Sequence, residues 1–215
     1  MSWLEKQKWW LLLNGTALIV MIIVVTQGSL ATASVADTFD PLLASGKWAV
    51  RFLLFSLSMT PISTYLGWRG AIRLRKPAGL WAFGFTAVHL IYYFWEYQLT
   101  MLTWPLQQRF LLYGFLGFGI LAALALTSNK WAMRQLKKNW KRLHRLVYVA
   151  GLSVGFHAML ATTASKRIFL RDPDVLPELI LYFLLVVILL AVRIPLVRRV
   201  ILTVGRKRPF QLSTD

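Results

Sequence analysis

The sequence of 215 residues contains no cysteine. This absence excludes disulfides, zinc–thiolate sites, iron–sulfur clusters and the covalent attachment of haem through a CxxCH motif. Charge is also scarce, because 15% of the residues are charged, against about 25% in an average soluble domain. The apolar content of 57% excludes a disordered chain, since it provides ample surface to bury. Together these features predict a membrane protein.

Six apolar runs are long enough to cross a hydrocarbon core of about 30 Å, which takes about 20 helical residues. Turn or charged residues bound each run, and the runs cover 9–27, 48–66, 79–97, 110–127, 146–164 and 179–197. Backbone groups cannot stay unpaired in lipid, so the runs predict transmembrane helices. The first run exceeds the apolar stretch of a signal peptide, and we expect it to remain as a helix. The sequence thus predicts an all-α bundle of six transmembrane helices, a single domain over 1–215.

Acidic residues are few, and the basic residues are unevenly distributed. The chain has 25 Lys and Arg against 8 Asp and Glu, a net charge of +17. With six spans, 19 of the basic residues and two of the acids lie on the side of the termini, so this side carries the whole excess. The positive-inside rule therefore predicts that both termini are cytoplasmic. The charge sets orientation and contacts anionic lipid, and we do not expect nucleic-acid binding.

Equipment for soluble catalysis is also missing. The segments between the runs are about 10 to 20 residues long, too short for a catalytic domain. No GxGxxG-type nucleotide site follows a strand, and Gly114, Gly117 and Gly119 lie inside an apolar run, where close helix packing explains them. We therefore expect no complete catalytic site in this chain.

Two of the three histidines lie inside apolar runs. His89 lies about ten residues into the third run and His157 about eleven into the fifth. Both runs lead outward from the cytoplasm in the predicted topology, so each imidazole lies about 15 Å deep at 1.5 Å per residue. Two neutral imidazoles at one depth on separate helices can bind the iron of a haem from both faces. The alternative is that each histidine forms a hydrogen bond across the helices.

The third histidine, His144, precedes His157 by 13 residues, about 20 Å along a helix axis. That spacing suits a second haem near the cytoplasmic face, with His144 as a ligand of its iron. However, 13 steps of about 100° leave His144 about 140° away from the helix face of His157. The alternative is an interfacial group that binds lipid or a haem propionate.

Two glycines and two arginines complete the candidate residues. Gly151 and Gly155 would leave a flat groove for the face of a porphyrin, or they would pack against another helix. Arg51, near the outer end of the second run, would hold a haem propionate or extend its charge to the membrane surface. For Arg193, near the cytoplasmic end of the sixth run, we expect the guanidinium to reach the surface in the same way.

Three stretches occur in a characteristic order and spacing. They are residues 46–61 with Phe52-Leu53-Leu54 and Thr60-Pro61, residues 75–81 leading to His89, and residues 140–144 followed by Tyr148 and His157. This arrangement resembles the MsrQ (YedZ) family, which comprises haem-containing membrane subunits of the bacterial methionine sulfoxide reductase system within the ferric-reductase-like transmembrane superfamily.

The resemblance implies a b-type cytochrome of the bacterial inner membrane. The family passes electrons to a periplasmic molybdopterin reductase, MsrP, which restores methionine from its sulfoxide in oxidised proteins. The quinone pool or a cytosolic flavin reductase would supply the electrons, and FMN is a further cofactor of the family. The resemblance implies His89, His144 and His157 as ligands of haem iron, with one haem or two. Related NADPH oxidases use four histidines for two haems, so a second haem here would take a water, a non-histidine ligand or an open position.

Other functions fit parts of the same pattern. The chain would be a cytochrome b subunit of another periplasmic oxidoreductase, or a haem-free transporter or scaffold in which the histidines relay protons or pack helices. The outer segments 28–47, 98–109 and 165–178 are the candidates for docking a periplasmic partner. A protein without a nucleotide domain or molybdenum-binding loops can conduct electrons, and its task is to hold and tune the cofactor.

Overall fold

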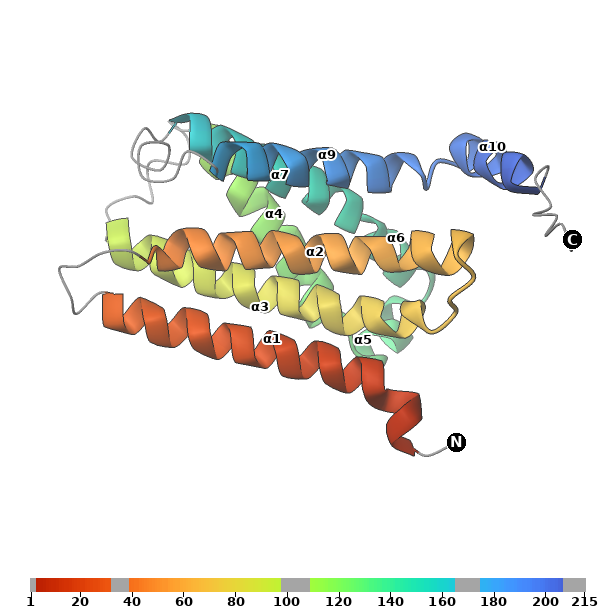
Figure 1. Cartoon of the computed structure of the whole chain (residues 1–215), viewed down its shortest axis with the longest axis horizontal. Coiled ribbons are helices and arrows are strands. Elements are labelled where there is room, and N and C mark those ends of the chain that lie inside the picture. The colour runs from red at the N-terminus through yellow and green to blue at the C-terminus, as the bar shows by residue number, and fades with distance from the viewer. Residues whose placement is uncertain (1–2, 32–38, 98–108, 165–174, 207–215) are drawn as a thin grey trace, which may run out of the picture.

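The computed structural model describes residues 3–31, 39–97, 109–164 and 175–206. Within these ranges every regular element is a helix. The helices are α1 (Trp3–Ala31), α2 (Pro41–Tyr65), α3 (Ala71–Tyr97), α4 (Arg109–Leu126), α5 (Lys130–Leu136), α6 (Lys138–Arg145), α7 (Val147–Ala164), α9 (Val175–Ala191) and α10 (Pro195–Arg206). The longer helices lie lengthwise beside one another, and α1 begins at the end of the bundle where α9 finishes (Figure 1).

Within the described ranges, three helical segments are long and apolar enough to cross a membrane, namely Gln7–Ser29, Pro41–Tyr65 and Lys138–Ala161. The number rises to five if each of two bent helix pairs counts as one span: α4 with α5, and α9 with α10. The third expected run, 79–97, is helical within α3 but is not among these segments. His89 and the Trp and Tyr side chains of α3 lower its mean hydropathy, because such side chains prefer interfaces to hydrocarbon.

Local signals at the helix ends explain several boundaries. Asp40 caps α2, because its Oδ1 accepts a hydrogen bond of 2.8 Å from the Leu43 amide, and Pro41 occupies the first helical position. Asn129 caps α5 in the same way through the Ala132 amide, also at 2.8 Å. The basic segment after the fourth run is therefore helical, divided between α5 and α6 at Lys137, whose φ of 48° breaks the helix.

The sixth expected run, 179–197, is divided. Helix α9 ends at Ala191, and α10 leaves at an angle of 84°. Pro195 lacks an amide N–H and disfavours helical backbone at the residue before it. The turn between the helices accordingly contains two backbone hydrogen bonds between residues three apart. Arg193 N donates to Leu190 O at 3.1 Å, and Ile194 N donates to Ala191 O at 3.0 Å.

The buried core lies mainly between α2 and α3. Phe52 and Phe85 stack with centroids 5.3 Å apart and planes at 11°, and Phe85 is fully buried. Small residues beside them, such as Ala49 and Ala82, let the two helices approach closely. At one end of the bundle Trp9 of α1 packs edge-on against Trp68 in the turn between α2 and α3, with centroids 5.6 Å apart. Helix α1 thus lies along the outside of the α2–α3 pair (Figure 1).

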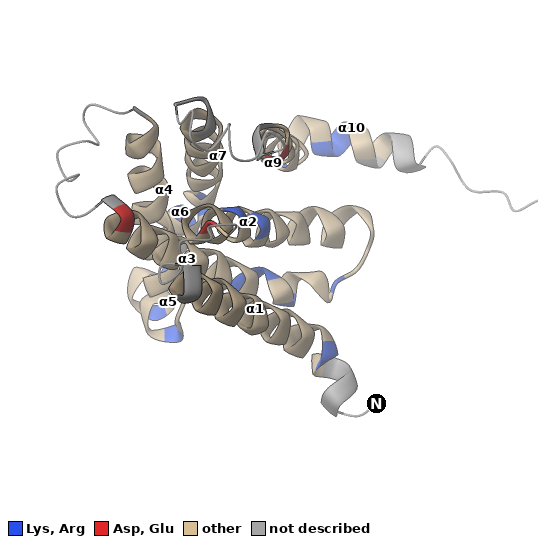
Figure 2. Cartoon of the chain, turned by 60° about the vertical axis from the view of Figure 1, so that its left-hand side comes forward, with Lys and Arg blue, Asp and Glu red and all other residues tan. Residues whose placement is uncertain are grey.

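The outer surface carries many exposed aliphatic side chains, particularly along α1 and α9. These include Leu12, Ile19, Ile22, Leu181, Leu184 and Ile188. Such a surface is typical of helices that face lipid. Basic residues lie on α5, on α10 and near the start of α1 (Figure 2). This distribution is that of a helical membrane protein.

Candidate haem site

The structure brings the two apolar-run histidines together. His89 on α3 and His157 on α7 have ring centroids 6.1 Å apart, with the ring planes at 80°. Neither ring belongs to a larger cluster, because the described part of the chain holds no group of three or more His, Cys, Asp or Glu side chains suited to a metal ion. The two imidazoles for which the sequence predicts a similar depth thus lie side by side, as a pair without a third such ligand among the described residues.

Each imidazole is fixed by a backbone carbonyl of a neighbouring helix. His89 Nδ1 lies 2.8 Å from Leu42 O on α2, and His157 Nδ1 lies 2.8 Å from Phe110 O on α4. A carbonyl oxygen can only accept a hydrogen bond, so both Nδ1 atoms carry the proton and both Nε2 atoms keep a lone pair. This tautomer is the one in which the imidazole is a neutral metal ligand through Nε2.

Two glycines make room for the rings. A Cβ atom on Gly46 would lie 3.0 Å from His89 Nδ1, and one on Gly114 would lie 2.8 Å from His157 Nδ1. Both separations are shorter than an ordinary van der Waals contact, so any side chain at these positions would push the imidazole away. Each histidine therefore lies directly over the backbone of the facing helix. The sequence had indicated helix packing for Gly114 and no individual role for Gly46.

Each histidine, with its carbonyl and its glycine, forms what we call a half-site. The two half-sites repeat one pattern along the chain. In each, a carbonyl is followed four residues later by the glycine, and the histidine comes 47 residues after the carbonyl. The second pattern is the first shifted by 68 residues, from 42 to 110, from 46 to 114 and from 89 to 157. The helix pairs α2–α3 and α4–α7, which pack tightly within themselves, thus supply one equivalent imidazole each. This equal interval was the signal in the sequence for both glycines.

His144 lies away from this pair, in the last turn of α6. Its ring stacks on Trp140 with centroids 4.0 Å apart, and its Nε2 lies 3.3 Å from Thr127 Oγ1 at the end of α4. Trp140 Nε1 also donates to Thr127 O at 2.9 Å, which holds the group together. The turn at Leu146 separates α6 from α7, so His144 and His157 do not share one uninterrupted helix.

Gly151 and Gly155 lie against side chains of other helices. A Cβ atom on Gly151 would meet Leu57 Cδ1 of α2 and Val186 Cγ1 of α9, both at 3.4 Å. A Cβ atom on Gly155 would lie 2.7 Å from Phe183 Cδ2 of α9. These are contacts of helix packing, the alternative that the sequence left open for both residues.

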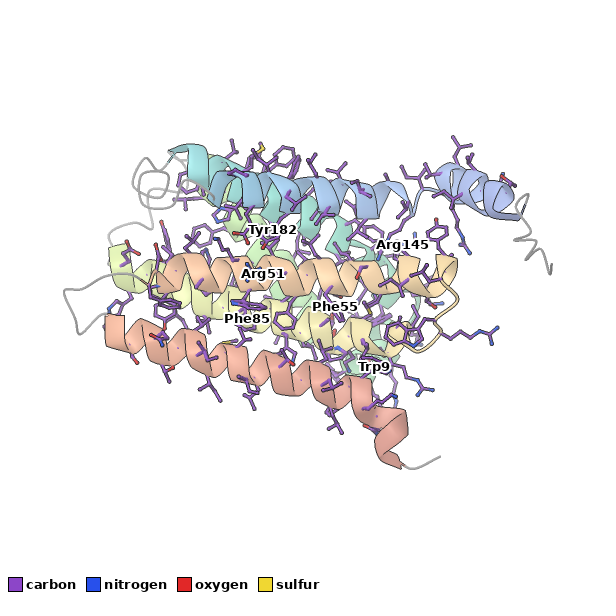
Figure 3. All side chains as sticks on the ribbon, in the orientation of Figure 1. Trp9, Arg51, Phe55, Phe85, Arg145 and Tyr182 are labelled. Carbon is purple, nitrogen blue, oxygen red and sulfur yellow. The ribbon has the colours of Figure 1, made fainter. Side chains whose placement is uncertain are left out.

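Arg51 belongs to a polar cluster between α2 and α9 (Figure 3). Its Nε donates to Tyr182 Oη and its Nη2 to Glu178 Oε1, both at 2.7 Å. Lys47 Nζ adds a second ion pair with Glu178 at 2.6 Å, and the Arg51 guanidinium lies 4.7 Å from the centre of the Trp48 ring. The sequence had given Glu178 and Tyr182 no role, because residues 127 or more positions apart reveal no contact in a single sequence.

Comparison with known proteins identifies this architecture. The sequence profile described as "Ferric reductase like transmembrane component" matches residues 45–155, which is just over half of the chain. The chain belongs to this family. The matched region contains His89, His144 and the glycine at each half-site, and it ends two residues before His157.

Individual family members extend the comparison. The chain is 38% identical over 118 residues to a Bordetella pertussis protein named "Protein-methionine-sulfoxide reductase heme-binding subunit MsrQ". It is 38% identical over 120 residues to the protein of that name from Xanthomonas euvesicatoria, and 37% over 117 residues to that from Xanthomonas campestris. Each alignment covers 53% of this chain and 54% to 57% of the relative, so the similarity spans about half the length of these proteins.

Proposed function

We propose that this chain is a haem b subunit that passes electrons across a membrane, with His89 and His157 as the two axial ligands of the haem iron. The distance of 6.1 Å between the ring centroids carries this proposal. Two nitrogen–metal bonds of about 2 Å, together with about 1 Å from each nitrogen to the centre of its ring, put the centroids of opposed imidazoles roughly 6 Å apart. The observed pair therefore fits an iron held from both faces.

The anchoring carbonyls prepare the imidazoles for this role. With Nδ1–H donated to Leu42 O or Phe110 O, each ring presents Nε2 without first losing a proton. Such a bond also fixes the ring's orientation and raises its basicity as a ligand. A bound haem supplies reversible one-electron chemistry. The chain's part is to hold the rings, to keep water away with apolar helices and to tune the potential through these bonds.

The orientation we propose has six spans and both termini in the cytoplasm of a bacterium, with the chain in the inner membrane. The basic side chains on α5 and α10 and near the start of α1 support it under the positive-inside rule (Figure 2). The opposite ends of α2, α3 and α9 carry Asp40, Glu96 and Glu178. The electrons would then leave from the end of the bundle near His89 and His157.

The partner we propose is a periplasmic MsrP-like molybdopterin reductase, which returns methionine sulfoxide to methionine. The names of the relatives support this choice, since they place those proteins in a protein-methionine-sulfoxide reductase. Quinone or a cytosolic flavin reductase is the proposed donor, with FMN as a further cofactor. Of the proposed docking segments, most of 98–109 and 165–178 and part of 28–47 lie outside the described residues.

His144 supplies one imidazole at the other end of the bundle. A second haem there would take its other axial position from water, from a non-histidine residue or leave it open. The stacked Trp140 ring and the contact of Nε2 with Thr127 hold the imidazole in this structure, and iron bound at Nε2 would replace the contact with Thr127.

The decisive experiment is quantitative haem extraction, with reduced-minus-oxidised spectra, on the purified wild type and three histidine variants. We expect His89→Ala and His157→Ala each to abolish the spectrum of the haem bound between these two histidines, here called the paired haem. His144→Ala is the matched control, and we expect it to retain that haem. Recovery of the spectrum of His157→Ala on addition of imidazole would show that the fold survives. Unchanged haem content in His89→Ala and His157→Ala would refute the ligand assignment.

The close rival is a cytochrome b subunit that serves another periplasmic oxidoreductase. Electron transfer from the reduced protein to a purified methionine sulfoxide reductase, compared with another molybdoenzyme, separates the two functions. Faster oxidation by the sulfoxide reductase supports our proposal, and equal or slower oxidation supports the rival.

A further inference from the structure

Arg193 has an environment that neither the histidine pair nor the orientation of the chain explains. It lies in the turn between α9 and α10, and its side chain points into the bundle, where Nη2 donates to Leu57 O of α2. The expectation that this guanidinium reaches the membrane surface is therefore wrong. The tight turn before Pro195 directs the residue toward α2, and Tyr65 Oη fastens the same turn by donating to Val192 O.

Most of the guanidinium's hydrogen-bonding capacity is unused. Nε and Nη1 of Arg193 are buried and have no hydrogen-bond partner among the described residues. The ring of Tyr148 on α7, 5.2 Å from the guanidinium carbon, offers its face to the charge. Nε and Nη1 together carry three N–H groups, and the neighbouring Tyr148 hydroxyl, which also interacts with this side chain, is neutral and does not balance its charge. A buried charge is normally paired, and an unpaired one indicates a missing partner.

The other groups around Arg193 are neutral or positively charged. Arg75 of α3 lies within electrostatic range of both Arg193 and His144, and its backbone is tied to α2 by Ser56 Oγ at 2.8 Å. Thr60, three residues beyond Leu57 on the same helix surface, has a buried hydroxyl without a partner in the described chain.

Among the acids whose side chains the structure describes, Asp40, Glu96 and Glu178, none forms an ion pair with Arg193. Asp40 and Glu178 lie at the starts of α2 and α9, and Glu96 lies at the end of α3. In Figure 1 these helix ends gather at the opposite end of the bundle from the turn between α9 and α10. The site is also distant from the histidine pair, because Leu57 follows Gly46 by 11 residues on α2, about 16 Å at 1.5 Å per residue.

We propose that Arg193 is the centre of an oxyanion site between α2, α7 and α9, which binds the carboxylate or phosphate group of a ligand. An oxyanion supplies both the missing negative charge and the missing acceptors, and guanidinium groups suit carboxylate and phosphate equally. Two sources provide this chemistry, namely a porphyrin propionate and a phosphate monoester. The proposal does not depend on haem binding by His89 and His157.

The first test measures thermal unfolding of the purified full chain in a zwitterionic detergent, while inorganic phosphate replaces chloride at constant ionic strength. We expect phosphate to raise the Tm of the wild type by several degrees, since a ligand of the native state stabilises it. In Arg193→Gln we expect no rise. Arg193→Lys keeps the charge without the planar fork and should show a smaller rise. Arg198→Gln, which changes an exposed arginine of α10, is the matched control and should respond like the wild type.

The second test identifies the source of the oxyanion by comparing haem with its dimethyl ester, which has no carboxylates. If a propionate occupies the site, Arg193→Gln should weaken haem binding about tenfold while binding of the ester is unchanged. If a phosphate monoester occupies it, Arg193→Gln should bind both porphyrins normally and lose only the phosphate response. The proposal is overturned if Arg193→Gln matches the wild type in both tests. If the wild type shows no spectrum of the paired haem, the proposed function is refuted, but the phosphate test of Arg193 remains valid.

Discussion

The helix pairs α2–α3 and α4–α7 present the same half-site at one end and different residues at the other. At the histidine end a carbonyl, a glycine and an imidazole recur at equal intervals in both pairs. At the other end a histidine lies only beside the second pair, namely His144 on α6, and the same shift of 68 residues takes it back to Lys76, an exposed residue of α3 (144 to 76). The pairs thus match at the end where we propose two equivalent haem ligands, and they differ at the other end.

The pairs also differ in how they are stabilised. The first contains its own aromatic core, in which Phe85 lies between Phe52, Trp48 and Trp81. The second pair packs against α9, since Phe183 and Val186 fill the space beside Gly155 and Gly151 of α7. The α2–α3 pair is therefore packed through its own aromatic side chains, whereas the α4–α7 pair also packs against α9.

The largest expected effect on haem binding comes from filling the space that Gly46 and Gly114 leave for the imidazole rings. Gly114→Ala and Gly46→Ala place a methyl group 2.8 Å and 3.0 Å from the Nδ1 atoms, so the rings must move away from their carbonyls. Loss of such an outer-shell bond typically lowers metal affinity about 10- to 100-fold. We expect haem per protein to fall in both variants, and more in Gly114→Ala.

Gly119→Ala is the matched control on α4, because nothing lies within 4 Å of its added Cβ. It should retain full haem content. Equal haem content in Gly114→Ala and Gly119→Ala would show that the equivalence of the half-sites has no functional meaning.

The dependence of the second pair on α9 should be visible in stability. Gly155→Ala puts a methyl group 2.7 Å from Phe183 Cδ2, and such overpacking costs about 1–3 kcal/mol. Gly151→Ala meets its neighbours at 3.4 Å and should cost less. Thermal unfolding measures the difference, and Phe183→Leu should restore the stability of Gly155→Ala. A change in the haem spectrum of Gly155→Ala would instead assign the glycine to the cofactor.

A helix cap tests whether the first half-site depends on the start of α2. Asp40→Ala removes the bond to the Leu43 amide, next to the carbonyl that holds His89, and should cost about 1 kcal/mol. It should also shift the haem absorption band or potential. Asn129→Ala removes the equivalent cap of α5 at a similar cost and should leave the spectrum unchanged. Indistinguishable spectra for these two variants would contradict the prediction.

The smallest effect concerns the ion pairs that join α2 to α9. Glu178→Gln weakens the contacts with Lys47 and Arg51, but these groups are partly exposed, so the loss should stay below about 1 kcal/mol. We expect a small decrease in Tm that shrinks further at high salt. A larger decrease that salt does not affect would show that this cluster contributes as much as the aromatic core of the first pair.

Several of these features could be predicted from the sequence alone. Each apolar run overlaps one long helix, because composition reports burial in lipid directly, but α2 and α3 begin seven and eight residues before their runs. The meeting of His89 and His157 followed from their equal distance from the start of each run. The equal interval of 47 residues was also present in the sequence, although its meaning depends on which helices pair.

Other features depend on the path of the chain in space. The inward direction of Arg193 follows from a turn that composition does not register, since the apolar run continues through it. The contacts of Gly151 and Gly155 with α9 likewise require knowing which face of α7 meets which helix. Arg51 found its partners on α9 for the same reason, as both Glu178 and Tyr182 are remote in the sequence.

The anchoring of each histidine within its own helix pair bears on how the protein is made. Leu42 holds His89 between two consecutive helices, so this grip can form during synthesis, before residue 110 leaves the ribosome. The second grip, between Phe110 and His157, forms later and independently. Assembly then requires only that the two finished helix pairs pack against each other. We expect a haem to enter most easily just before they do.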